Sequence, residues 1–125
     1  MAALKELTSK EDLDFLIKEF YKEAMSNEQI GHFFTEDVQL DLVNHLPKIA
    51  AFWSDILFGS KLYKSNPMQK HIELHAISPL RKEDFVVWLG LWKKTINKHF
   101  MGAKAEEAIA RAENIAAVMQ FKLSQ

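Results

Sequence analysis

The sequence predicts an all-α fold in a single domain that spans residues 1–125. Three observations support this class. Every strong apolar pattern in the chain recurs with the helical period of about 3.6 residues. No segment alternates between apolar and polar side chains as a half-buried strand does. The chain has only four Gly and three Pro, well below the roughly 12% that these residues contribute on average, so turns are few.

A first helix is predicted to begin at Thr8 or Ser9 and to end at Ser26. Thr8 is followed three residues later by Glu11, which is the spacing of a capping box. A short helical turn is expected over residues 28–34. The apolar side chains of the first helix lie on one stripe, which comprises Leu13, Leu16, Ile17, Phe20, Tyr21 and Ala24.

A second long helix is predicted over residues 37–58. Pro47 lies inside it, and because proline lacks an N–H and crowds the carbonyl of Val43, we expect a kink or a restart near Leu46. Gly59 is a plausible C-terminal stop. One face of this helix carries Leu42, His45, Leu46, Ile49, Trp53 and Ile56.

Three further helices are predicted in the second half of the chain. Asn66-Pro67 has the form of a cap followed by proline at the first helical position, and the short helix that it opens carries Met68, His71, Ile72 and His75 on one side. The next helix covers about residues 82–100, ends before Gly102, and has an inner stripe of Phe85, Trp88, Leu89, Trp92 and Ile96. The last covers about residues 103–123 and turns inward Ala108, Ile109, Ala112, Ile115, Ala116 and Met119.

Composition excludes several classes of function. The chain has no Cys, which removes disulfides, thiolate metal sites and cysteine nucleophiles. Its formal net charge of −1 argues against nucleic acid as the main partner, since that binding needs a basic surface. No stretch approaches the ~20 apolar residues that span a bilayer, and the first residues do not have the pattern of a signal peptide. We therefore expect a cytoplasmic protein with no membrane partner.

The histidines are the residues most informative about chemistry. His32 and His99 are expected at the surface, whereas His45, His71 and His75 each lie on the apolar face of a predicted helix. A buried imidazole must find a hydrogen bond or a metal. His71 and His75 are four residues apart and share a helix face, but no third zinc ligand is evident.

A flat, apolar cofactor accounts for these histidines better than zinc does. Haem needs one imidazole and a wall of apolar rings, and the chain has nine Phe, three Trp and two Tyr. Tyr21 and Trp88 would add polar donors inside an apolar pocket. Periodicity does not choose between His71 and His75 as the ligand. The alternative is a cofactor-free helical interaction domain in which these rings are only core and the histidines bond to backbone carbonyls.

The chain resembles the truncated haemoglobins, and most closely their third group. The resemblance covers about residues 12–121, and no single piece of it is diagnostic. The pieces that match, in order, are Phe20-Tyr21, Ile30-Gly31 with Phe34, His45-Leu46, Phe52-Trp53, Leu57-Phe58-Gly59, Tyr63, Pro67-Met68-Gln69-Lys70-His71, Trp88-Leu89-Gly90-Leu91-Trp92 and Arg111-Ala112-Glu113-Asn114-Ile115-Ala116.

The resemblance implies a shortened globin fold, with helices packed two over two around haem b. It implies His71 as the iron ligand, and Tyr21, His45 and Trp88 on the distal side where a gas binds. The residues expected to contact the cofactor are His71, His45, Phe34, Ile49, Phe52, Trp53, Tyr63, Met68 and Trp88.

The resemblance also implies a function. The iron would be five-coordinate and would bind O₂ and other diatomic ligands such as NO and CO, with slow O₂ release because distal donors hydrogen-bond to the ligand. Nitric oxide detoxification or peroxide chemistry is possible, and either would need a separate reductase, since the sequence has no flavin or nicotinamide motif. We expect a monomer or a weak dimer.

Overall fold

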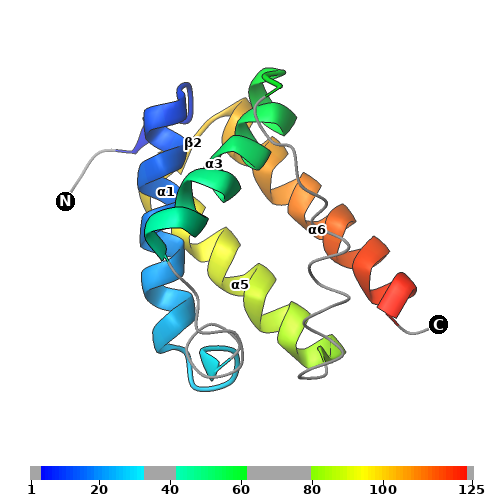
Figure 1. Ribbon diagram of the computed structural model, residues 1–125. Helices are drawn as coiled ribbons and strands as arrows, with labels where there is room; N and C mark the ends of the chain where they lie inside the picture. Colours follow the sequence, from blue (N-terminus) through cyan, green and yellow to red (C-terminus); the bar gives the residue numbers. More distant parts are fainter. Residues whose placement is uncertain (1–3, 33–41, 62–79, 124–125) are drawn as a thin grey trace.

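The computed structural model describes residues 4–32, 42–61 and 80–123. Within these ranges the chain forms four helices, α1 (Lys10–Ser26), α3 (Leu42–Phe58), α5 (Lys82–His99) and α6 (Ala103–Leu123). A very short parallel pair joins strand β1 (Lys5–Glu6) to strand β2 (Phe100–Met101). Helix α1 packs against α3 and α5, and α5 runs antiparallel to its neighbour α6 (Figure 1). The all-α prediction is confirmed.

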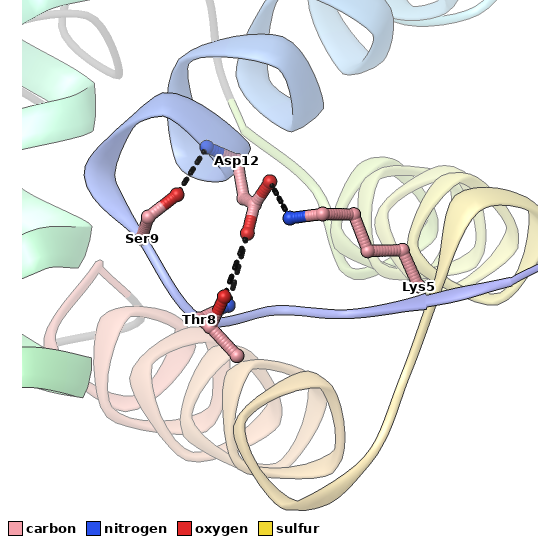
Figure 2. A network of polar contacts seen from close by, with 4 residues as sticks. All are labelled: Lys5, Thr8, Ser9 and Asp12. Carbon is pink, nitrogen blue, oxygen red and sulfur yellow. Dashed lines mark hydrogen bonds and ion pairs between the residues drawn. The ribbon is translucent and has the colours of Figure 1, made fainter.

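Helix α1 begins at Lys10 and is capped by Ser9, the second of the two predicted starts, so the cap is not Thr8. Ser9 is the N-cap, and its hydroxyl accepts a hydrogen bond from the Asp12 N–H at 3.2 Å. The predicted Thr8–Glu11 capping box is wrong. Asp12 takes the role expected of Glu11 and accepts the Thr8 N–H at 3.0 Å (Figure 2), because the extended backbone at Ser9 shifts the box by one residue.

The stripe predicted for α1 is buried throughout, and it packs toward α3 and α5. Its members have exposed fractions of 8% or less: Leu13, Leu16, Ile17, Phe20, Tyr21 and Ala24. The helix ends at Ser26, as predicted, and Asn27 follows as the C-cap. The Asn27 side chain accepts the N–H groups of Gln29 and Ile30, which holds the turn that follows.

Helix α3 runs without interruption through Pro47. Of the two predicted outcomes near Leu46, the restart is therefore wrong, and the kink stays a prediction. Pro47 lies early in the helix, and the apolar face beyond it, which includes buried Ala50, Trp53 and Leu57, keeps the segment packed. The predicted start at residue 37 lies outside the described residues. Gly59 ends α3 with φ of +71°, a conformation that glycine adopts at no steric cost, as predicted.

Helices α5 and α6 match the prediction closely. Helix α5 begins at Lys82 and ends at His99, one residue early, because Phe100 is extended and pairs with Lys5. Helix α6 spans the predicted range, and its small inner residues lie against the rest of the molecule: Ala105, Ala108, Ala112 and Ala116. The short helix predicted after Pro67 lies outside the described residues.

The β1–β2 pair is a feature that the sequence did not predict, since two residues are too few to show alternation. It holds the N-terminal segment against the corner between α5 and α6. Gly102 turns this corner with φ of +95°. Leu7, which follows β1, is 1% exposed and belongs to the main core.

Candidate functional site

The centre of the described molecule is a stack of three indoles. Trp53 of α3 lies over Trp92 of α5, with ring centroids 4.8 Å apart and planes inclined by 26°. Trp88, one turn before Trp92, lies parallel to it at 6.1 Å and 5°. Trp53 and Trp92 are buried, whereas Trp88 is half-buried. The i,i+4 spacing of Trp88 and Trp92 explains why one helix presents both rings to the same side.

Phe20 of α1 joins this stack to Tyr21. Its ring meets Trp92 edge-on at 5.2 Å, Trp88 at 5.7 Å and Tyr21 at 5.4 Å. Edge-to-face contacts of this kind are the favoured geometry between aromatic rings. The two donors predicted for the distal side, Tyr21 and Trp88, therefore both contact the Phe20 ring, although they come from different helices.

Tyr21 is buried, with an exposed fraction of 8%. Burial raises the pKa of its phenol well above the usual range, because the charged phenolate is disfavoured away from water. The hydroxyl is therefore neutral and retains its proton at all ordinary pH values. A neutral phenol in this position is a hydrogen-bond donor and acceptor.

Trp88 offers a second neutral donor, because an indole N–H donates and never accepts. The predicted wall residues Ile49 and Phe52 of α3 are half-buried and pack against the same core. Phe52 also meets Trp53 edge-on at 5.6 Å. The structure thus brings Tyr21, Trp88 and the described wall residues to one core, between α1, α3 and α5.

Other predicted site residues lie outside the part of the chain that the structure describes. These are Phe34, Tyr63, Met68 and His71, together with His75, the competing candidate. His45 is on the first turn of α3, and its side chain also lies outside the description. The choice between His71 and His75 therefore stays a prediction.

His32 and His99 were predicted to lie at the surface, and both are half-buried rather than exposed. His99 lies against the Phe15 ring, with centroids 5.0 Å apart.

Trp92 was predicted only as a member of an inner stripe, and its indole N–H donates to the Ala108 carbonyl at 3.1 Å. No spacing in the sequence indicates that Trp53 stacks on it, because the two residues come from separate helices.

Within the described ranges, no group of three or more His, Asp or Glu side chains is placed to hold a metal ion. The donor set at the core consists of one phenol and indole rings, all uncharged, within apolar walls. Such a set fits a flat apolar group that carries a small polar ligand, rather than a bare cation, which takes charged or carbonyl oxygen ligands. The described residues therefore fit a haem group.

Comparison with known proteins agrees with this geometry. No family model matches the chain. The chain is similar to the group 3 truncated hemoglobin ctb of Campylobacter jejuni, with 26% identity over 121 residues, which cover 94% of this chain and 93% of the relative. It is also similar to the crystal structure of group III truncated hemoglobin from Campylobacter jejuni, with a TM-score of 0.86 and 25% identity, over 97% of this chain and 95% of that one. Since both sequence and fold match over nearly the whole length, the chain has a shortened globin fold and is similar in sequence and structure to group 3 truncated hemoglobin.

Proposed function

We propose that this chain binds haem b through His71 and holds O₂ there, together with other diatomic gases such as NO and CO. The similarity to group 3 truncated hemoglobin in sequence and fold supports a haem-binding globin, and the uncharged donor set of the core supports a gas site. A bound haem supplies an iron with one position open to a diatomic ligand. Tyr21, His45 and Trp88 would face that ligand.

The observation that carries this proposal is that the buried, neutral Tyr21 and the half-buried Trp88 both contact the Phe20 ring. A ligand that gains negative charge is stabilised by donors, and hydrogen bonds to charged groups contribute roughly 1.5–3 kcal/mol. That range corresponds to about 10- to 150-fold in ligand release. We therefore propose slow O₂ release.

The aromatic walls have a second role in this proposal. Phe20 contacts both donors, and Phe52 and Trp53 belong to the same core. An apolar wall of this kind excludes water that would compete for the same hydrogen bonds. Because the surroundings are apolar, each remaining hydrogen bond is electrostatically stronger than it is in water.

The direct test of the proposal is the absorption spectrum of the purified chain. We expect a red protein with an intense haem band, which His71→Ala weakens or removes. His75→Ala is the matched control, since it removes an imidazole one turn away, and we expect it to keep the band. A colourless wild-type protein that refuses added haem would favour the alternative, a cofactor-free helical interaction domain.

Reaction of held O₂ with nitric oxide, or chemistry on peroxide, is the enzymatic form of this proposal. Strong donors that slow O₂ release make free delivery of O₂ less effective and leave more time for reaction. Such turnover requires electrons from a separate reductase. Turnover of nitric oxide with a supplied reductant distinguishes an enzyme from a simple O₂ binder.

The partners expected for this chain are diatomic gases and, for turnover, a separate reductase. None of the helices in the described part of the chain is long and apolar enough to cross a membrane. Sedimentation at several protein concentrations tests the expected monomer or weak dimer.

A further inference from the structure

All three tryptophans of the chain belong to the central stack. Trp92 is its middle ring, because its ring centroid lies 4.8 Å from that of Trp53 and 6.1 Å from that of Trp88. The gas site proposed above uses Trp88 as a donor and Trp53 as part of a wall, but it gives no role to Trp92. A parallel arrangement of easily oxidised rings at these separations is suited to the movement of single electrons.

The surroundings of Trp92 favour an oxidised indole that keeps its proton. Its N–H donates to the Ala108 carbonyl oxygen at 3.1 Å, and an amide carbonyl is too weak a base to remove that proton. The ring is 1% exposed, so bulk water does not take the proton either. Trp53 and Trp88 place electron-rich π faces beside it, and such faces attract a positive charge.

Trp88, at one end of the stack, and Trp92, its middle ring, lie in different surroundings. Trp88 is half-buried and belongs to the proposed gas site. Trp92 instead contributes to the floor of a groove of about 290 Å³ between α5 and α6, whose lining comprises Leu89, Gly90, Trp92, Lys93, Ile109 and Glu113. Gly90 lines this groove, and a Cβ added there would meet no atom within 4 Å.

We propose that the three tryptophans form a one-electron relay between the haem pocket and the groove of α5 and α6. When hydrogen peroxide is reduced in the pocket, the stack supplies one electron through Trp88, and the positive charge then rests on Trp92. A small enediol or phenol in the groove returns the electron. This inference rests on the proposed haem binding.

The electrons and atoms balance as follows. Reduction of one hydrogen peroxide breaks its O–O bond and consumes two electrons and two protons to give two waters. One electron comes from the indole stack, where no bond breaks, and the other from the haem group; the protons come from solvent. Two enediol molecules such as ascorbate then each give one electron to Trp92 and release one proton to solvent. The first electron restores the oxidised stack, and the second passes through the stack and restores the haem group.

The first test is electron paramagnetic resonance of haem-loaded protein frozen soon after peroxide is added. We expect an organic radical whose spectrum narrows when the tryptophan rings are deuterated, and at least a tenfold smaller signal in Trp92→Phe. Trp53→Phe, which leaves the Trp88–Trp92 pair intact, should lose less signal. If Trp92→Phe does not fold, deuteration of the wild-type chain still shows whether the radical is on a tryptophan, and a radical that does not narrow rejects the relay.

Three results would overturn the relay. A radical that narrows only when tyrosine is deuterated places the charge elsewhere. A full-sized radical in folded Trp92→Phe removes Trp92 from the route. Consumption of peroxide with an intact haem band but without any radical rejects the relay while the proposed haem binding stands. Absence of a haem band, by contrast, is failure of the proposed function itself, and the relay fails with it.

The second test addresses the groove. Ascorbate should accelerate the decay of the radical. Gly90→Leu, which adds a side chain to the groove lining, should reduce that acceleration several-fold when each decay is compared with the same variant's decay without ascorbate. Asn114→Leu is the control, since Asn114 is exposed on α6 and does not line the groove. Equal acceleration in Gly90→Leu and the wild type would show that the electron returns by another route.

Discussion

At the scale of single residues, burial and hydrogen bonding set the charge of two side chains, Tyr21 and Asp12. Burial raises the pKa of the Tyr21 phenol and keeps it neutral. Burial also acts to raise the pKa of Asp12, but hydrogen bonds from Lys5, Thr8 and Ser9 and the positive charge of Lys5 outweigh it and lower that pKa from 3.8 to about 2. The first residue is thus a neutral donor, and the second is a structural anion.

The Tyr21 hydroxyl is expected to slow O₂ release. Removing it in Tyr21→Phe keeps the ring and its contact with Phe20 but removes the donor. The O₂ dissociation rate should rise about 10-fold or more, as expected when a hydrogen bond to a charged ligand is lost. Stopped-flow displacement of O₂ by CO measures this rate. An unchanged rate in a variant with an intact haem band would contradict the role of Tyr21.

Asp12 is expected to make stability depend on acid pH. A carboxylate whose pKa is lowered in the folded state contributes stability above pH 3.8, and this contribution is lost as pH falls toward about 2. The loss should be on the order of 1–2 kcal/mol, and urea unfolding at pH 5 to 2 measures it. Asp12→Asn should flatten this dependence, whereas Asp14→Asn, an exposed neighbour on the same helix, should not. A wild-type slope equal to that of Asp12→Asn would exclude this carboxylate as the cause.

At the scale of elements, small residues on α6 decide how closely the helices approach. Ala105, Ala108, Ala112 and Ala116 are all 3% exposed or less, and their methyl groups face the core rather than solvent. The indole N–H of Trp92 donates to the Ala108 carbonyl. Larger side chains on this face of α6 would keep the indole too far from that carbonyl. A helix of small residues is therefore required beside the indole stack.

Ala112→Leu should destabilise the fold by overpacking. Ala112 is fully buried, and inserting larger side chains into a packed core costs roughly 1–3 kcal/mol. We expect the melting temperature to fall by roughly 3–10 °C, measured by circular dichroism at 222 nm. Ala117→Leu, at an exposed position of the same helix, should change it little. Equal melting temperatures for the two variants would show that α6 has room to move outward.

The elements also differ in how well local sequence predicts them. The ends of α6 and the stop at Gly59 follow from local preferences and are observed as predicted. Local chemistry at Pro47 predicted a kink or a restart. The helix does not restart, and Leu46 and Ile49 on either side of the proline pack against the core. Tertiary contacts here outweigh the loss of one backbone hydrogen bond.

At the scale of the whole molecule, the N-terminal segment ties the beginning of the chain to the corner between α5 and α6. The β1–β2 pair joins residues almost one hundred positions apart, and Leu7 enters the core beside it. Lys5 reaches Asp12 at 2.6 Å, as Figure 2 shows. The segment is thus held by backbone pairing, apolar burial and one ion pair.

Leu7→Ala should be strongly destabilising, although Leu7 lies before the first helix. Truncating a buried leucine to alanine costs about 2–5 kcal/mol, and denaturant unfolding measures this change. Leu4→Ala is the matched control, because Leu4 is 46% exposed and should cost much less. If the two variants lost equal stability, the segment would not be docked as described.

The sequence by itself determined the class of fold, the inner stripes of the helices and the resemblance to truncated haemoglobins, because helical periodicity and an ordered set of short motifs are local properties. It also selected Tyr21 and Trp88 as neutral donors. Only the tertiary structure decided that both meet Phe20 and that Trp53 stacks on Trp92. It alone revealed that Phe100 leaves its helix to pair with Lys5. These contacts join residues from separate elements, and their geometry depends on how whole helices pack, which no spacing along one chain segment specifies.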